Sequence, residues 1–547
     1  GHFFRGLAGQ DMSGIDNIGG QVLPQQENVS YDHGVFARRD GEFYHFMLGK
    51  LASSAAAIEP LKKGNSMCEI FGAYGWSEGL RLEKYLLDHF MVRGINHFVP
   101  HAYSAKAYPD PDCPPHFYAN GNHPQHRHFG ELMAYTNRVC ELIQGGRHIA
   151  PVAVLYHGDG EWAGDTMFSH RIGRILAEYP IDYDNVPMDI FAEREKYQTR
   201  VEQKKLLVNT QEYSLLIVPK MQYVTEAFAN GVIEMSKAGV MLCFIEDYPE
   251  GLSDVSGATR VEKVQSELLE MKKYPCFELN ELKNYLEKIG VAELVMEPSC
   301  KDLRYYHYEH HEGLGVYLFV NEGTSCYEGK LGIQEARKCL IYNAWENRLE
   351  ELPKNNSGEV FLRIEPLKSL ILLADDKFIM LDDSMELCKP LSLDVIREMT
   401  EVEINPLWKR STCRSIDYPK FDEEKEIFLP DRLADAAPEF SGFVRYENSL
   451  FIDYADNEKL PNKAILEIGD AYEGVEVFVN ETSLGIQIIP PFIYDVEKAL
   501  KPGVNTIVIE VATSLEREMA KMPDMFGRVT EATTQSGITG MVRLWVE

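Results

Sequence analysis

The run Ser66–Phe71 (SMCEIF), the loop GAYGWSEG after it and Leu80–Arg93 (LRLEKYLLDHFMVR) decide the fold of the first part of the chain. Ser66–Phe71 is short and apolar, as buried strands are. Apolar residues recur at helical spacing through Leu80–Arg93, and Gly94 is suited to end a helix. Ile95–His101 (INHFVPH) then has the pattern of another strand. This order of strand, helix and strand predicts a βα unit of a parallel sheet.

The same alternation extends to both sides of this unit. An earlier unit is predicted from Ile15–Leu23 to the helix-like stretch Phe43–Ile58, and another helix is predicted at Phe129–Ile143. We therefore expect residues 1–148 to form strands and helices of an α/β domain.

Residues 149–300 predict a second α/β domain. Pro151–Tyr156 (PVAVLY) has the pattern of a buried strand, a polar loop (HGDGEWAGD) follows, and helices are predicted at Thr166–Glu178 and Glu226–Ala238. The pattern is typical of an open, doubly wound sheet of the flavodoxin type. No GxGxxG or GxxxxGK[ST] motif follows the first strand, so no nucleotide is assigned to this domain.

The remainder of the chain changes to the two-residue period of strands. Residues 301–410 alternate in short runs, which predicts a β-sandwich. A Pro- and charge-rich linker is expected near Asp417–Asp431, and residues 411–547 are predicted to form another all-β domain.

Composition restricts the class of function. The chain has 547 residues and a formal net charge of −30, which disfavours binding to nucleic acid and to anionic lipid. Its content of 45% hydrophobic residues supports several cores. Its ten cysteines form no CxxC pair, so we expect most of them to be buried thiols. No apolar run reaches the ~20 residues of a membrane span, and no signal peptide opens the sequence.

The stretch Cys68–Trp76 (CEIFGAYGW) holds the richest group of candidate site residues. Reactive groups collect at the carboxyl ends of parallel strands, and Glu69 lies near such an end. Tyr74 and Trp76 offer aromatic faces for a sugar, and glycoside hydrolysis needs a pair of carboxyl groups. The alternative is structural: Glu69 would satisfy a backbone group, and Trp76 would fill the core.

Histidines and an aromatic residue follow the next predicted strand. His101 and Tyr103 are expected at the same rim, where they would hydrogen-bond substrate hydroxyls, although a structural role for His101 is an open alternative. A further cluster lacks the HExxH spacing of zinc proteases and is expected in a solvated loop. Its members are His116, His123, His126 and His128.

Two further segments carry polar candidates. Asp11, Asp16 and Gln21 lie around the first predicted strand and would bind sugar hydroxyls or a calcium ion, although capping and turn roles explain the aspartates equally well. Trp162, with Asp159 and Glu161 beside it, follows the first strand of the second domain and would close over the rim, or else lie in a solvated loop. No GxSxG elbow and no nucleophilic cysteine motif is present.

Three runs together resemble the large multidomain bacterial α-L-rhamnosidases. They are Leu48–Pro60 (LGKLASSAAAIEP), Cys68–Trp76 and Val92–Ser104 (VRGINHFVPHAYS). The resemblance implies a glycoside hydrolase with a (β/α)8-type barrel, which residues 1–148 would supply in part. It also implies an oligosaccharide or polysaccharide substrate, possible calcium binding and a periplasmic or extracellular location.

Later runs resemble accessory domains of such enzymes. Pro151–Asp165 (PVAVLYHGDGEWAGD) and Ile181–Pro187 (IDYDNVP) resemble the flavodoxin-like domain that follows the barrel there and in some β-galactosidases. Val475–Val511 and Ser536–Leu544 (SGITGMVRL) resemble the sugar-binding jelly roll of β-galactosidase-type enzymes. Residues 411–547 are therefore expected to be a jelly roll.

The resemblance assigns a role to Glu69. The family inverts configuration with two glutamates, and its glutamate before the Phe-Gly-Ala motif matches Glu69, which would be the general base. A complete barrel takes ~250 residues, so residues 1–148 are expected to hold only three or four βα units. The first half of the barrel, with its acid, is expected to be absent. Asp11, Asp16 and Glu27 are local candidates for an acid.

Two other functions stay open at this point. A retaining, β-galactosidase-like hydrolase would carry the same accessory domains. A non-catalytic carbohydrate-binding protein would use the incomplete barrel and the β-domains as a scaffold. The residues do not select the sugar or the oligomeric state.

Overall fold

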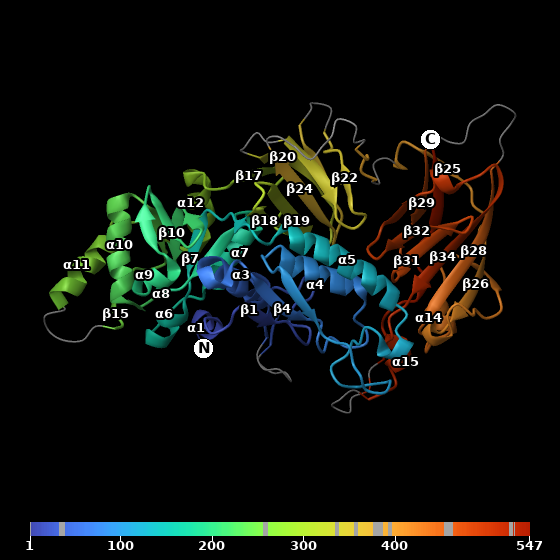
Figure 1. Ribbon diagram of the computed structural model, residues 1–547, viewed down its shortest axis with the longest axis horizontal. Helices are drawn as coiled ribbons and strands as arrows, with labels where there is room; N and C mark the ends of the chain where they lie inside the picture. Colours follow the sequence, from blue (N-terminus) through green and yellow to red (C-terminus); the bar gives the residue numbers. More distant parts are fainter. Residues whose placement is uncertain are drawn as a thin grey trace.

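The structure is a computed structural model that describes residues 2–31, 39–254, 261–333, 338–354, 359–375, 387–391, 396–452, 463–523, 529 and 531–547. Figure 1 shows the α/β region with α10 (Glu226–Ala238) and α11 (Val261–Met271) at one end of the molecule. The C-terminal strands lie at the other end, and the helices of the first region lie between them. Within the described residues, no helix combines the length and apolar character that a membrane span requires.

A three-stranded parallel sheet of order β1-β4-β5 forms the first region. This confirms the parallel βα pattern of the sequence. The π-helix η1 continues into α3, so the helix expected at Phe43–Ile58 is present with a short π segment. The elements are α1 (Phe3–Leu7), β1 (Ser13–Asp16), β2 (Ser30–Tyr31), β3 (Arg39–Asp40), α2 (Gly41–Phe43), η1 (Tyr44–Leu48), α3 (Gly49–Ile58), η2 (Pro60–Lys62), β4 (Ser66–Ile70), α4 (Leu80–Met91), β5 (His97–Pro100), η3 (Ala119–Gly121), α5 (His126–Leu142) and β6 (Arg147–His148).

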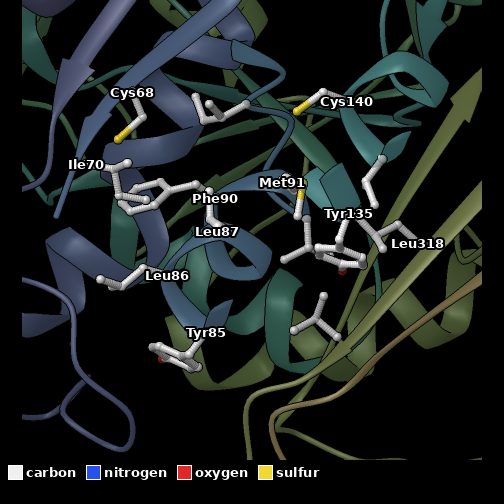
Figure 2. Packing of buried hydrophobic residues seen from close by; sticks show 14 of the residues in the cluster. Cys68, Ile70, Tyr85, Leu86, Leu87, Phe90, Met91, Tyr135, Cys140 and Leu318 are labelled. Carbon is white, nitrogen blue, oxygen red and sulfur yellow. The ribbon is translucent and has the colours of Figure 1, made fainter. Parts of the chain in front are cut away.

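Helix α4 is the centre of the first core. Cys68 and Ile70 alternate with half-buried residues along β4, so both face this core. Figure 2 shows them beside the residues of α4, among them Phe90, with Tyr135 of α5 on the other side. Leu318, from β19 (Gly315–Asn321), belongs to the same cluster. The core of the sheet and the core of the following β region are therefore continuous.

The second region has a five-stranded, fully parallel sheet of order β16-β14-β12-β7-β8. Numbered along the chain, this is 2-1-3-4-5, the order of the flavodoxin type. The elements are β7 (Val152–Leu155), α6 (Gly158–Ala163), α7 (Ser169–Glu178), β8 (Tyr183–Val186), α8 (Asp189–Ala192), α9 (Arg194–Tyr197), β9 (Arg200–Glu202), β10 (Lys205–Val208), β11 (Gln211–Tyr213), β12 (Leu215–Val218), β13 (Tyr223–Val224), α10, β14 (Met241–Ile245), β15 (Gly251–Leu252), α11, β16 (Cys276–Phe277), η5 (Leu279–Glu281) and α12 (Leu282–Ile289).

Two antiparallel sheets with a shared core follow. The larger has the order β22-β21-β24-β19-β18-β6, so β6, from the end of the first region, is its edge strand. The smaller has the order β17-β20-β23. The strands are β17 (Leu294–Glu297), β18 (Leu303–Glu309), β19, β20 (Tyr327–Ile333), β21 (Lys338–Asn343), β22 (Arg348–Glu350), β23 (Phe361–Ile364) and β24 (Ser369–Asp375).

The C-terminal region also consists of two larger antiparallel sheets around one core. Their orders are β25-β36-β29-β33 and β27-β26-β28-β34-β31-β32. The elements are β25 (Thr400–Val402), β26 (Leu407–Cys413), η6 (Ser415–Asp417), β27 (Lys425–Phe428), α14 (Leu433–Ala436), β28 (Phe443–Ile452), β29 (Ala464–Ile468), β30 (Ala471–Tyr472), β31 (Val475–Val479), β32 (Thr482–Gln487), β33 (Phe492–Asp495), η7 (Glu497–Ala499), β34 (Gly503–Ala512), α15 (Glu516–Met519), β35 (Gly537–Ile538) and β36 (Val542–Val546).

The strand β27 corrects the linker that the sequence predicts near Asp417–Asp431. Residues Lys425–Phe428 pair with β26 at the edge of the six-stranded sheet. Edge strands are often charged because one side of the strand faces solvent, so their composition is similar to that of a linker. These sheets also include β25 and β26, which begin before residue 411.

The cysteines are less buried than the sequence predicts. All ten are unpaired thiols, and only four of them are buried: Cys68, Cys140, Cys243 and Cys413. Cys388 is exposed, and the other five are half-buried. The expectation that most are buried is therefore wrong, because Cys113, Cys300, Cys326 and Cys388 lie in segments outside the named strands and helices.

Candidate active site

The candidate site lies where three parallel strands end. In register, Asp16 of β1 pairs with Glu69 of β4, and Glu69 pairs with Val99 of β5. Register partners on neighbouring strands point to the same face of a sheet. Glu69 is half-buried, Asp16 is exposed and Val99 is 51% exposed, so this face is open. Two carboxyl groups thus share an accessible face at the carboxyl end of the sheet.

The end of β4 is held on both sides by backbone hydrogen bonds. The Asn17 N–H donates to the carbonyl oxygen of Glu69 at 2.9 Å, and the His101 N–H donates to that of Ile70 at 2.8 Å. Directly after the strand, the buried Phe71 has φ +80°, a conformation that costs energy for an aromatic residue. These contacts fix the backbone that carries Glu69.

His101 lies beside the pair of Asp16 and Glu69, directly after β5. A Cβ added to Gly72 would lie 3.4 Å from the His101 ring, so a larger side chain there would crowd the histidine. Among the described residues, the buried Nδ1 of His101 has no hydrogen-bond partner. An unsatisfied buried nitrogen is unusual in a folded protein, which marks His101 as a candidate functional residue.

Neighbouring charges shift the pKa of Asp16. Although the residue is exposed, partial desolvation of its carboxyl group by neighbouring atoms raises the pKa of Asp16, the negative charge of Glu69 raises it further, and His101 opposes the shift. A carboxyl with a raised pKa keeps its proton to a higher pH and is thereby suited to donate it.

Tyr74 supports the loop beside Asp16. Its hydroxyl donates to Oδ1 of Asn17 at 2.7 Å, lies 3.0 Å from the Val22 carbonyl oxygen and accepts from the Val22 N–H at 3.2 Å. Gln21 lies in the same loop, where its Oε1 accepts from the Ile18 N–H at 3.2 Å. The Tyr74 hydroxyl and the Gln21 Oε1 are therefore both bonded within the loop.

The predicted aromatic residues occupy different surroundings. Tyr103 is 68% exposed and stacks on Tyr118 with ring centroids 5.9 Å apart. Trp76 is half-buried and packs against Leu515 and Met519 of the C-terminal region. Tyr103 therefore offers the more accessible face.

The second-domain candidates lie in a helix and not in the expected loop. Asp159, Glu161 and Trp162 belong to α6, whose two glycines give the sequence the appearance of a loop. Trp162 is 59% exposed, and its ring lies 5.6 Å from that of His2. Asp159 pairs with Arg5 at 2.9 Å. The contacts of this group are thus with the N-terminal helix.

The solvated loop expected around four histidines is also corrected. His126 and His128 lie in the first turn of α5, and His116, His123 and His128 are buried. Burial lowers the pKa of His123 and of His128 to about 3 in each case, with smaller contributions from neighbouring positive charges. Tertiary packing outweighs the Pro- and Gly-rich composition here.

No calcium site follows from the donors predicted for it. Asp11 is exposed, and Gln21 Oε1 already accepts a backbone hydrogen bond. Across the part of the chain that the structure describes, no group of three or more His, Cys, Asp or Glu residues could hold a metal ion. The residues present do not fit the ion, so no step is derived through it.

Asn17 is a site residue that the sequence reasoning missed. It is fully buried next to Asp16, its backbone bonds Glu69, and its Nδ2 has no partner among the described residues. The signal available in the sequence is an amide directly after a strand-end carboxylate.

Comparison with known proteins gives a structural likeness. No family model matches the sequence, and no curated protein matches it. The fold is similar to that of a rhamnosidase from Novosphingobium sp. PP1Y, with 14% identity and a TM-score of 0.69 over 98% of this chain. The chain spans about half of that protein, 51% of its length. A β-galactosidase from Bacillus circulans sp. alkalophilus matches 68% of this chain and 61% of its own, at 11% identity and a TM-score of 0.43.

Proposed function

We propose that the chain carries the catalytic base of a glycoside hydrolase of the α-L-rhamnosidase type, and that Glu69 is this base. The observation that supports the proposal most is the register pair of Asp16 and Glu69 on an open face at the carboxyl ends of parallel strands. The likeness to a rhamnosidase in fold agrees with it.

Each carboxyl group has a role in this reaction. Glu69 accepts a proton from a water molecule as that water attacks the anomeric carbon, and a second carboxyl group protonates the leaving oxygen. Of the local acid candidates, Asp16 has the most suitable position and a raised pKa. Asp11 is exposed, and Glu27 lies in the segment between β1 and β2 and not at the end of a strand.

A retaining reaction is the second candidate, and one observation favours it. Neighbouring strands lie about 4.8 Å apart, so register partners are close. Carboxyl groups ~5–5.5 Å apart are typical of retaining enzymes, whereas inverting enzymes hold them ~6.5–9.5 Å apart. If Asp16 is the acid, its place on the strand beside Glu69 is compatible with retention, in which Glu69 would act as the nucleophile. Following the anomer formed first by NMR separates the two reactions.

The sugar contacts are proposals as well. The half-buried His101 lies beside the carboxyl pair, and Tyr103 has an exposed face. Both would contact a terminal sugar. Tyr74 and Gln21 would act by holding the loop, and Trp76 by joining the rim to the C-terminal region.

The domain assignments complete the proposal. We interpret residues 1–148 as part of a (β/α)8-type barrel and 149–300 as flavodoxin-like. Residues 301–410 would form a β-sandwich, and 411–547 a jelly roll that binds sugar. A glycan substrate fits the acidic chain, and a periplasmic or extracellular location would bring the enzyme to it.

The test is hydrolysis of an aryl α-L-rhamnoside by the full-length protein and by its Glu69→Gln variant. Turnover that is lost in the folded variant supports the base role. Wild-type turnover in the variant would overturn that role. Sugar binding without any turnover by the wild-type protein would instead indicate a carbohydrate-binding protein.

A further inference from the structure

A cavity of about 350 Å³ lies away from the carboxyl pair, where three parts of the molecule meet. Helices α4 and α5 contribute Lys84 and Tyr135, the sandwich sheets contribute Trp345 and Ile371, and the C-terminal region contributes Ile489. The volume is within the range of small-molecule sites, ~300–1,000 Å³.

Four cationic side chains line this cavity, and three of them have carboxylate partners. Lys84 Nζ lies 2.5 Å from Asp88 Oδ2. The Nε atoms of Arg348 and Arg363 lie 2.8 Å from Glu350 Oε1 and Glu365 Oε1, respectively. These pairs leave little positive charge for a ligand.

Lys368 is the exception. Its Nζ donates to the Pro491 carbonyl oxygen at a long 3.4 Å, and among the described residues it has no carboxylate within ion-pair distance. Burial lowers the pKa of Lys368 to about 8, and the nearby Lys84 contributes, while Glu365 and Glu346 oppose the shift. Lys368 is half-buried, and a partly desolvated ammonium without a carboxylate partner is unfavourable, so an anion in the cavity would be stabilised beside it.

The remaining lining residues indicate which uncharged part of a ligand would fit the cavity. Ile341, Ile371, Ile489 and the ring of Trp345 form an apolar lining. The amide of Gln487 is already used, because it donates to the Ile493 carbonyl oxygen and accepts from the Ile493 N–H. Other polar side chains of the lining also bond within the protein: Asn343 with Glu350, Ser369 with Tyr135, and Glu346 with Arg348. This disfavours a sugar and favours a flat apolar ring.

We propose that this cavity binds an apolar, ring-bearing monocarboxylate, whose carboxylate pairs with Lys368 and whose ring packs between Trp345 and the isoleucines. The proposal does not depend on the glycosidase activity. The ligand would join the helices, the sandwich and the segment before β33, and would stabilise their junction.

Isothermal titration of the full chain tests the proposal, with trans-cinnamate as the probe. Cinnamyl alcohol has the same ring without the charge, and galacturonate has the charge on a hydroxylated body. We expect cinnamate to bind at least tenfold more tightly than either. Equal binding of the alcohol would overturn the anion site, equal binding of galacturonate would overturn the apolar body, and no cinnamate binding at millimolar concentration would overturn the whole proposal.

Variants of Lys368 separate a ligand contact from a structural role. Lys368→Met should weaken cinnamate binding at least tenfold, Lys368→Arg should retain it, and the surface control Lys409→Met should not change it. The ligand-free melting temperature of Lys368→Met should not fall, because the variant removes a half-buried ammonium that has no carboxylate partner among the described residues. Unchanged binding in Lys368→Met would overturn the proposal.

A measurement on the unmodified chain covers the case in which the variant does not fold. The cinnamate carboxylate stays ionised at neutral and alkaline pH, whereas Lys368 is largely neutral one pH unit above its pKa. The charged groups that face Lys368 are Lys84, Glu346 and Glu365. Binding should weaken about tenfold between pH 7 and pH 9. Constant affinity over this interval would overturn the role of Lys368.

Discussion

Asp16 and Glu69 are register partners on the parallel strands β1 and β4, so their carboxyl groups occupy neighbouring positions on one face of the sheet. The pair lies at the carboxyl end of the strands, beside His101, and the backbone around it is fixed by hydrogen bonds to Asn17 and His101. The two carboxyl groups are therefore close to each other and lie on an open face, and the pKa of Asp16 is raised.

Glu69→Gln should lower kcat on an aryl α-L-rhamnoside by about 10²–10⁴, the usual contribution of a general base. The amide keeps the size of the side chain but cannot accept the proton of water. Rates of nitrophenol release measure the effect. Glu131→Gln, at an exposed position on α5, is the matched control and should keep full activity. Similar rates in both variants would exclude Glu69 as the base.

The loss of kcat/KM in the Asp16→Asn variant should depend on the leaving group of the substrate. If Asp16 donates the proton, kcat/KM should fall by about 10²–10⁴ for an alkyl rhamnoside, whose leaving oxygen needs protonation. The loss should be much smaller for a dinitrophenyl rhamnoside, which departs without a proton. Asp11→Asn, at an exposed aspartate of the same segment, serves as control. Equal losses on both substrates would show that Asp16 is not the acid.

A buried ion network joins the first and second regions. Lys50 Nζ lies 2.5 Å from Asp182 Oδ1, His148 Nε2 lies 2.6 Å from Asp182 Oδ2, and His148 Nδ1 lies 3.2 Å from Asp184 Oδ2. Burial alone would lower the pKa of His148, but the charges of Asp182 and Asp184 outweigh it and raise the pKa to about 9. The imidazolium is therefore the form that the fold holds at neutral pH.

His148→Gln should destabilise the protein by about 3–5 kcal/mol at pH 7, because it leaves two buried carboxylates short of a partner. In the wild type, the folded pKa lies above the unfolded value, so this stability is complete below about pH 6.5 and is lost as pH rises through about 9. Urea unfolding between pH 6 and pH 9.5 measures both effects. His126→Gln, at an exposed histidine, should change neither. A variant as stable as wild type at pH 7 would contradict the role of the network.

Local signals explain which parts of the fold the sequence could predict. The helix Glu226–Ala238 is observed with the predicted bounds, because Thr225 caps its start and Gly239 takes the left-handed conformation at its end. The start of α5 at His126 has no side-chain cap and was missed. The position of Glu69 at a strand end could be predicted from the sequence. Its pairing with Asp16 depends on sheet register, which local sequence does not determine.

Three buried carboxyl groups meet where α4 begins against the C-terminal region. Glu78, Glu83 and Glu473 are 1%, 3% and 8% exposed, and both carboxylate oxygens of Glu78 lack a partner among the described residues. The Arg81 N–H donates to Glu473 Oε2 at 3.1 Å, and the Arg81 Nε lies 3.8 Å from the same oxygen, so Arg81 partly offsets the rise in the pKa of Glu473 that burial causes. Burial raises the pKa of Glu83 to about 8, and the charge of Glu473 adds to the shift. The fold therefore favours the protonated form of Glu83.

Glu83→Gln should stabilise the protein at pH 8 by about 2–4 kcal/mol, because the amide mimics the neutral acid and removes the cost of ionising it. The folded pKa lies above the unfolded value, so the wild type is most stable below about pH 4.5 with respect to this group and loses stability as pH rises through about 8. The variant should lose less stability over that interval, as measured by urea unfolding at pH 5, 6.5 and 8. Glu131→Gln, at an exposed position of α5, should keep the wild-type slope. A Glu83→Gln variant that is less stable than wild type at pH 8 would mean that this carboxyl is ionised and paired in the folded protein.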